Sequence, residues 1–273
     1  MSTRTSGTLS PVLYLPHGGG PLPLLADPQH TALTRFLKTI RSQLGTPSAI
    51  LVISAHWEER CATLTSASNP ELIYDYYGFP PESYEIQYPA PGAPQLAQHI
   101  AKLLQDRGID SRLDAQRGFD HGMFVPLKLI YPEAEIPVVQ LSLLASLSPT
   151  AHINLGKALS SLREENILII GSGLSYHNLQ NFFNPSTSVQ QEDERFDDWL
   201  VDTCTSTDLT IADRESRLIE WEQAPFARDC HPREEHLLPL HVCFGIAVSQ
   251  TPVAQLAFNE PLMGKQVSAF LWR

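Results

Sequence analysis

Short apolar runs alternate with amphipathic segments along most of the chain. The runs are rich in leucine and β-branched residues, as buried strands are, and lie at 12–15, 49–54, 137–144 and 167–170. The amphipathic segments carry apolar residues at helical spacing, at about 28–44, 94–107, 121–130 and 148–163. Because strands that alternate with helices build a sheet covered by helices, we predict an α/β fold. It is a single domain over residues 1–273, with a mostly parallel central sheet flanked by helices.

The C-terminal part of the chain has a more polar pattern. Segments 189–205 and 215–221 predict amphipathic helices near the surface, and 234–248 predicts a helix with a strongly apolar face. Strands are expected at 255–258 and 267–272, with a turn near 259–261.

One segment, 57–87, has no regular period and is rich in tyrosine and proline. Long irregular segments inside a compact domain often cover a functional site. The stretch from Tyr74 to Tyr88 is therefore a candidate lid over a ligand, and packing of the tyrosines is the alternative.

Three of the ten histidines stand where an apolar run ends in a loop. They are His17 in VLYLPHGGG, His56 in AILVISAHW and His177 in ILIIGSGLSYHN. The loops that leave the carboxyl ends of the strands form the ligand crevice of an open α/β sheet. Imidazoles delivered there by separate strands predict a metal site at the C-terminal ends of the strands.

Each of these histidines also has a purely structural interpretation. His17 could belong to a tight turn with its glycines, His56 could be a hydrogen-bonded core residue, and His177 could lie in solvent. His121, in FDHGMFVPL, is either an acid/base or substrate-orienting group or the first residue of a helix that Asp120 caps.

A further cluster, HPREEH, lies at 231–236. Its spacing differs from HExxH, which excludes the zinc-protease motif, and it leaves His236 on one face of an apolar helix with Glu235 pointing elsewhere. The remaining helical histidines are expected to have structural roles: His30, His99, His152 and His241.

Composition narrows the classes of partner. The formal net charge of −11 argues against binding to nucleic acid or to an anionic membrane surface, because both require a positive patch. The four cysteines form no CxxC pair and are typical of reduced thiols in a cytoplasmic protein. The polar stretch 1–11 lacks the apolar core of a signal peptide. We expect a cytoplasmic enzyme, monomer or homodimer, that acts on a small molecule.

Several passages together resemble one enzyme superfamily. LPHGGGP, SAHW, DHGMFVPLKLIYP, GSGLSYHN and REEHLLPL occur in this order over nearly the whole chain. The chain is similar to the class III extradiol ring-cleavage dioxygenases, and more closely to their single-chain, DOPA-4,5-dioxygenase-type branch. The resemblance implies one catalytic domain that opens a catechol-type, DOPA-like ring with O2 at a non-haem metal.

The resemblance also implies roles for individual residues. His17, His56 and His236 match metal ligands of this branch, and His177 matches a histidine that is either a further ligand or the catalytic acid/base. His121 matches a catalytic histidine that orients substrate or oxygen. In the wider superfamily the third ligand is a glutamate, so Glu235 takes that place if the register shifts by one residue.

The ligand set bears on which metal is bound. Two histidines and a carboxylate are typical of non-haem iron(II), whereas three histidines also form an ordinary zinc site. We expect Fe(II) for activity, with Zn(II) as a bound but inert alternative for oxygen chemistry. Two other functions stay open at this point: a zinc-dependent hydrolase, and a non-enzymatic binding protein on the same scaffold.

Overall fold

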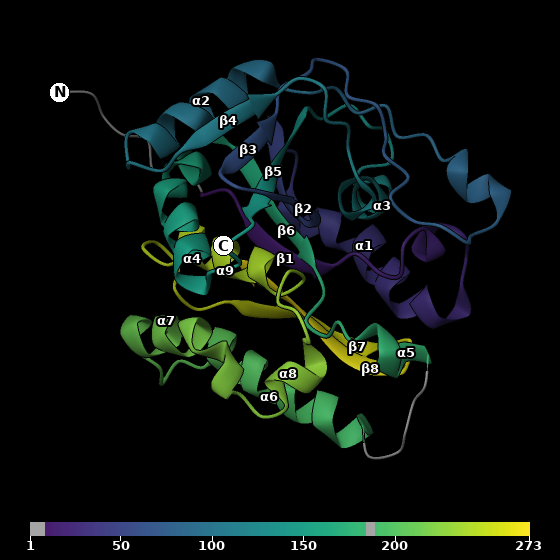
Figure 1. Cartoon of the computed structure of the whole chain (residues 1–273), viewed down its shortest axis with the longest axis vertical. Coiled ribbons are helices and arrows are strands. Elements are labelled where there is room, and N and C mark those ends of the chain that lie inside the picture. The colour runs from purple at the N-terminus through teal and green to yellow at the C-terminus, as the bar shows by residue number, and fades with distance from the viewer. Residues whose placement is uncertain (1–8, 184–188) are drawn as a thin grey trace.

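A sheet of eight strands runs through the middle of the molecule (Figure 1). This computed structural model describes residues 9–183 and 189–273, and across that part the strand order is β4-β3-β5-β2-β6-β1-β8-β7. The strands are β1 Val12–Pro16, β2 Ala49–Glu59, β3 Ala62–Thr65, β4 Ser111–Asp114, β5 Val138–Leu144, β6 Ile167–Gly173, β7 Gln255–Leu262 and β8 Lys265–Trp272. The central strands β5, β2, β6 and β1 are parallel, so their carboxyl ends open at one edge. The predicted α/β fold with a mostly parallel sheet is confirmed.

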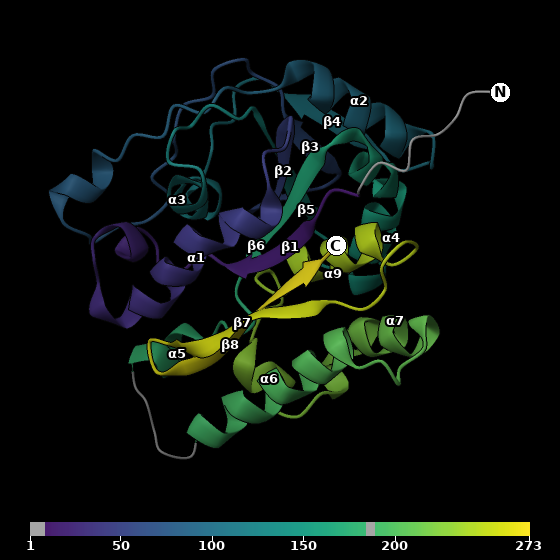
Figure 2. The ribbon, with the colours of Figure 1, turned by 180° about the vertical axis from the view of Figure 1, so that it is seen from behind.

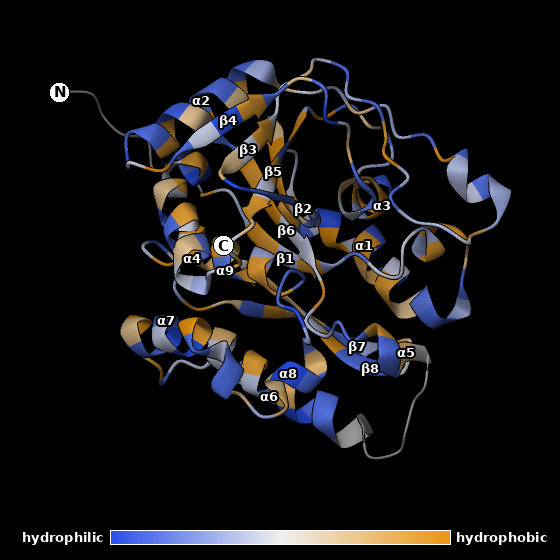
Figure 3. Ribbon diagram, viewed as in Figure 1, coloured by the Kyte–Doolittle hydropathy of each residue, from blue (hydrophilic) through white to orange (hydrophobic). Residues whose placement is uncertain are grey.

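Helices flank this sheet, as two opposite views show (Figures 1 and 2). The α-helices are α1 Thr31–Leu44, α2 Pro94–Gln105, α3 His121–Ile130, α4 Pro149–Ala158, α5 Leu179–Phe183, α6 Val189–Thr205, α7 Ile211–Ile219, α8 Ala227–Cys230 and α9 Leu238–Ala247. α1 packs on α3, which contacts β2 and β6, while α9 packs on β6, β1 and β2 and against α4. Apolar residues gather in the central strands and polar ones in the outer helices (Figure 3). Among the described residues no helix is long and apolar enough to cross a membrane.

Three predicted boundaries were wrong near the site. The strand expected at 49–54 continues to Glu59, with a shift of register between Ile53 and Glu58, so His56 lies inside an irregular stretch of β2. The strand expected at 167–170 continues to Gly173, where only glycine fits, because a Cβ would lie 2.1 Å from the carbonyl oxygen of His236. The helix expected from 234 begins at Leu238, because the preceding residues form a turn.

Other differences lie at the ends of the sheet. Strands β3 and β4 were not predicted: β3 falls in the irregular aromatic segment, and β4 has only four residues, all at least partly exposed. β7 runs through the turn expected near 259–261 and reverses only at Met263 and Gly264, both at positive φ. α6 is less superficial than expected, because Phe196 and Leu200 are buried and the helix packs on β8. α7 begins at Ile211, four residues before the predicted start at 215.

Candidate metal centre

Three histidines from distant parts of the chain meet at the carboxyl edge of the sheet. His17 follows β1, His56 lies in β2, and His236 lies in the turn before α9. One ligand atom from each can be chosen so that all lie within 4.8 Å of one another. The Nε2 atoms of His17 and His56 are 3.0 Å apart, and the ring of His236 is centred 5.2 Å and 4.9 Å from theirs. The predicted convergence of these residues is therefore present in the structure.

Hydrogen bonds orient two of these rings. The hydroxyl of Ser172 donates to the carbonyl of Gly122, so it accepts from Nδ1 of His17 at 3.1 Å. Nδ1 of His236 lies 2.9 Å from Oε1 of Glu235, which can only accept when ionised. In both residues the proton is held on Nδ1, and the lone pair of Nε2 is left for a ligand bond.

The environment keeps all three imidazoles neutral. Burial, followed by the neighbouring His56 and His236, lowers the pKa of His17 well below its usual value. Burial and then His177 do the same for the pKa of His236, and burial and then His121 for that of His56. A neutral imidazole is the form that binds a metal ion, so the site is prepared for a cation rather than for protons.

The spacing of the nitrogens fits a divalent ion. Two nitrogens that each lie about 2.1 Å from one ion, at a right angle, are about 3.0 Å apart. The Nε2 atoms of His17 and His56 have this separation. The donor set is three neutral histidines, which suits iron(II) or zinc.

Glu235 does not join this group. Its Oε1 lies between Nδ1 of His177, at 3.1 Å, and Nδ1 of His236, at 2.9 Å. Burial opposes ionisation of Glu235, but the hydrogen bond from His177, a backbone hydrogen bond and the charges of His177 and Arg233 together lower the pKa of the carboxyl. The structure therefore groups His236, and not Glu235, with His17 and His56, and places Glu235 behind the two histidines.

The two predicted catalytic histidines flank the trio. The ring of His177 stacks on that of His236, with centroids 3.4 Å apart, and the ring of His121 is centred 3.9 Å from that of His56. His177 and His121 both line a cavity of about 300 Å³, together with His56. Because Nδ1 of His177 is bonded to Glu235, its Nε2 is the nitrogen left for a ligand.

Asp75 belongs to the site and was missed from the sequence. Its Oδ1 accepts from the backbone N–H of His121 at 3.0 Å and from Nδ1 of the same residue at 2.8 Å, and its Oδ2 is 3.7 Å from Nδ1 of His56. Burial opposes ionisation, but the hydrogen bond and charge of His121 lower the pKa of Asp75 to about 2. The sequence feature that could have indicated Asp75 is a single acid among tyrosines, YDYYGFP, in the segment expected to act as a lid.

Asp120 has a different role from the predicted helix cap. It precedes α3, but its side chain makes no capping hydrogen bond. The buried carboxylate instead accepts from Ser54 at 2.8 Å, from Arg117 at 3.2 Å and from the amide of Gln140. It ties the start of α3, and with it His121, to the central strands.

The other histidines lie outside this cluster. Nε2 of His30 accepts from the N–H of Gly19 at 3.0 Å and so holds the glycine loop after His17. His152 and His241 are buried and bonded to backbone groups, while His99 is exposed beside Glu165. These positions agree with the structural roles expected for them.

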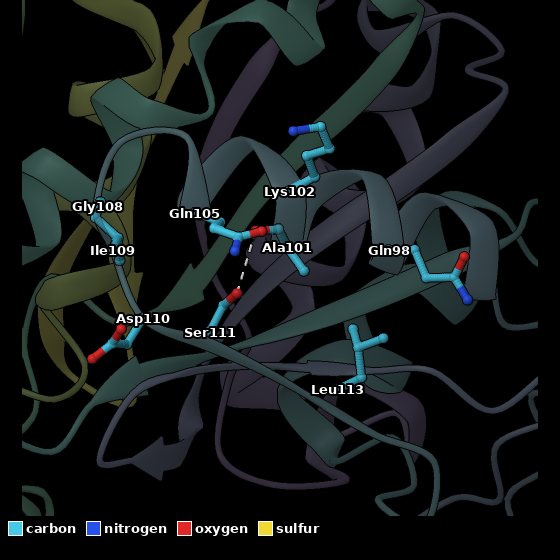
Figure 4. A pocket seen from close by; sticks show the side chains of 9 residues that line it. All are labelled: Gln98, Ala101, Lys102, Gln105, Gly108, Ile109, Asp110, Ser111 and Leu113. Carbon is cyan, nitrogen blue, oxygen red and sulfur yellow. Dashed lines mark hydrogen bonds between the residues drawn. The ribbon is translucent and has the colours of Figure 1, made fainter.

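A second hollow lies between α2 and β4 and offers a contrast (Figure 4). Its described lining includes Gln98, Lys102 and Asp110 but no histidine or cysteine. Lys102 is paired with Asp106 at 2.9 Å. This hollow has no metal-binding set, so the histidine cavity is the stronger candidate.

Comparison with known proteins gives one consistent family. Residues 10–271 match the model of the catalytic LigB subunit of aromatic ring-opening dioxygenase. The chain is 40% identical to dioxygenase tasH of Hapsidospora irregularis, over 99% of this chain and 87% of that protein. It is 38% identical to the 4,5-DOPA dioxygenase extradiol of Beta vulgaris, over 90% of both proteins. Its fold is similar to the crystal structure of an uncharacterized protein of Escherichia coli K12, with a TM-score of 0.75 and 28% identity over 96% of this chain and 99% of the other.

Proposed function

Because the chain belongs to the LigB family of aromatic ring-opening dioxygenases, we propose that it opens a catechol-type ring with O2 at a non-haem iron(II) centre. The observation that carries the proposal is the convergence of three neutral histidines, one of which, His56, lines a cavity of about 300 Å³ together with His121 and His177. Bound iron(II) would supply sites for the catechol oxygens and for O2, and electron transfer between them. His17, His56 and His236 would hold it.

His177 is proposed as the acid/base. Its Nδ1 is bonded to Glu235, so Nε2 can accept the proton that a catechol hydroxyl loses on binding and return it later. The stacking of its ring on that of His236 supports this role. Its role as a further ligand is the alternative.

His121 is proposed to orient substrate or oxygen from the opposite side. Asp75 holds the proton on Nδ1 of this histidine, so Nε2 is an acceptor in the neutral ring. The largely apolar walls of the cavity keep bulk water from the reacting ring.

The test is reconstitution of metal-free protein with Fe(II) under anaerobic conditions, followed by addition of catechols and air. We expect O2 consumption together with the absorbance of a yellow ring-opened product, and neither with Zn(II). If the Fe(II)-loaded protein consumes no O2 with any catechol, the proposal is wrong.

The three-histidine donor set also favours a second candidate, a zinc-dependent hydrolase. It predicts hydrolysis of activated esters by the Zn(II)-loaded protein without O2. The binding-protein alternative predicts an incomplete ligand set or a blocked cavity, and the complete trio and the open cavity argue against it.

Location and assembly complete the proposal. All four cysteines are free thiols, in keeping with a reducing cytoplasm. The stretch that argues against a signal peptide lies mostly at 1–8, outside the described residues. Fractionation of the native host and light scattering of the purified protein would test a cytoplasmic monomer or homodimer.

A further inference from the structure

The cavity above the histidines is apolar on its remaining sides. Apart from glycines and histidines, its described lining consists of aliphatic, aromatic and methionine side chains, for example Leu22, Tyr76, Phe79, Leu174 and Met263. No lysine, arginine, aspartate or glutamate is among the described lining residues. A ligand in this cavity therefore meets charge only at the metal and around the histidines.

The sequence around these walls explains why cations are absent. The lining residues near 17–22, 76–79 and 174–182 fall in three stretches, 5–34, 61–101 and 164–194, that contain no lysine or arginine at all. Most of the wall could therefore not gain a cation through a different side-chain conformation.

Three cationic side chains of neighbouring segments are already engaged with acids. These pairs are Arg117 with Asp120 at 3.2 Å, Arg233 with Glu58 at 2.5 Å and Lys265 with Asp193 at 3.9 Å. Arg117 also stacks on the ring of Trp57, at 4.8 Å. An incoming carboxylate would have to compete with an acid for each of these three side chains.

The acids nearest the cavity would repel such a group. Asp75 and Glu235 lie behind His121 and His177, and both are committed to hydrogen bonds with histidines. Their negative charge disfavours a substrate carboxylate in this cavity.

From these features we infer that the substrate is a catechol with a short, uncharged, apolar substituent. The inference rests on the proposed ring-opening function and names its substrate class. Burial of an unpaired carboxylate in an apolar wall is costly, whereas each buried methylene is favourable. A volume of about 300 Å³ is at the small end for ligand sites and suits one ring with a short chain.

The test compares substrates that differ in one group. The Fe(II)-loaded protein is assayed with 4-propylcatechol, with 3-(3,4-dihydroxyphenyl)propionate and with DOPA, and kcat/KM is measured by O2 uptake. We expect 4-propylcatechol to exceed both charged compounds by at least about tenfold, and each methylene from 4-methylcatechol to 4-propylcatechol to add about threefold to fourfold.

The outcomes separate this inference from the function on which it rests. Turnover that is equal or better with the propionate or DOPA overturns the substrate class and leaves the ring-opening function standing. Absence of O2 uptake with every catechol overturns the function, and the inference with it.

A charge-adding variant tests the reason for the preference. Leu179 is 56% exposed at the rim of the cavity, so Leu179→Arg places a cation there without disturbing the core. We expect the ratio of kcat/KM for the propionate over 4-propylcatechol to rise by up to about fivefold, the range of an exposed ion pair. Ile211→Arg is the matched control, because Ile211 is 47% exposed on α7 and does not line the cavity. An unchanged ratio in Leu179→Arg, or an equal rise in the control, counts against the inference.

Discussion

The histidine side of the cavity and its apolar cover differ in how the protein holds them. On the histidine side, His17, His56 and His236 are attached to central strands and their neighbours, and the backbone of His17 and His236 is hydrogen-bonded to neighbouring elements. The carbonyl of His236 accepts both from the hydroxyl of Tyr14 and from the N–H of Leu174, each within about 3.1 Å. The N–H of His17 donates to Gly173 of β6.

The cover is made of loops, a short helix and a hairpin tip. Tyr76 and Phe79 come from the long segment between β3 and α2, Phe182 from α5, and Leu262 and Met263 from the β7–β8 turn. Tyr76 and Phe79 lie outside helices and strands, and the other three lie in a five-residue helix or at the tip of a hairpin. Under the proposed function, the chemistry takes place beside the sheet, and the choice of substrate falls to loop and turn segments that tolerate change.

The largest effect is expected from removal of a ligand on the rigid side. His56→Ala leaves two histidines of the trio, so metal content should fall sharply and turnover should fall by more than the about 10²–10⁴-fold that an acid/base histidine contributes. Elemental analysis and O2 uptake measure the two quantities. His99→Ala, at an exposed histidine paired with Glu165, is the control and should retain both. Normal metal content in His56→Ala would show that the trio is not the metal centre.

The second largest effect is expected for His177→Ala, which distinguishes a role in proton transfer from a role in metal binding. His177→Ala should lower kcat by about 10²–10⁴-fold while the protein keeps its metal, because the proton acceptor is lost but the trio is intact. Metal content and kcat are measured on the same preparation. Loss of the metal together with activity would instead indicate that His177 is a further metal ligand beside the three histidines.

The sequence predicted the central strands of the sheet better than the strand at its edge and the strand ends near the site. The central strands were recognisable because a strand buried on both faces is a continuous apolar run. β4 was not, since Ser111–Asp114 is short, lies at an edge and is polar at three of its four positions. The strand at 167–170 was predicted too short because glycine usually signals a turn, whereas here the close approach of the carbonyl of His236 requires Gly173 within a strand.

At the site, the sequence pattern indicated which histidines lie near the ends of strands. It did not indicate which residues form the hydrogen bonds that orient them. Asp75 and His121 are 46 residues apart, and nothing local in either segment indicates that the aromatic loop folds onto the start of α3. The same holds for Ser172, which fixes the proton of His17 across 155 residues. Such contacts depend on the tertiary arrangement, so a sequence pattern does not contain them.

The stability of the packing between α6 and the β7–β8 hairpin is expected to depend on pH. Asp197 of α6 is buried and accepts from Asn259 of β7 and from Ser268 of β8, at 2.6 Å and 2.8 Å, and burial raises its pKa to about 6 from a usual value of 3.8. A raised pKa favours the protonated folded state, so this residue stabilises the fold at low pH, and its contribution is lost as the pH rises through about 6.

Comparison of Asp197→Asn with the wild type isolates this contribution. Between about pH 4 and about pH 7 the wild type should lose on the order of 2–3 kcal/mol of unfolding free energy relative to the variant, as measured by urea unfolding. The exposed Asp208→Asn variant should follow the wild type. If the unfolding free energies of Asp197→Asn and the wild type change with pH in parallel, Asp197 does not cause the pH dependence.

The smallest effect is expected at Asp75. This residue lies in the same loop as Tyr76 and Phe79 of the cover, but its side chain contacts His121 and His56. Asp75→Ala removes the acceptor that orients His121 and should lower kcat/KM by about 10–100-fold, with Asp75→Asn retaining more activity because its amide oxygen can still accept. In a His121→Ala background the same change should cost almost nothing, since its effect passes through that ring. Equal losses in both backgrounds, together with lower metal content, would show that Asp75 acts instead on His56, 3.7 Å away. The double-mutant cycle therefore decides whether the loop supports catalysis or the metal.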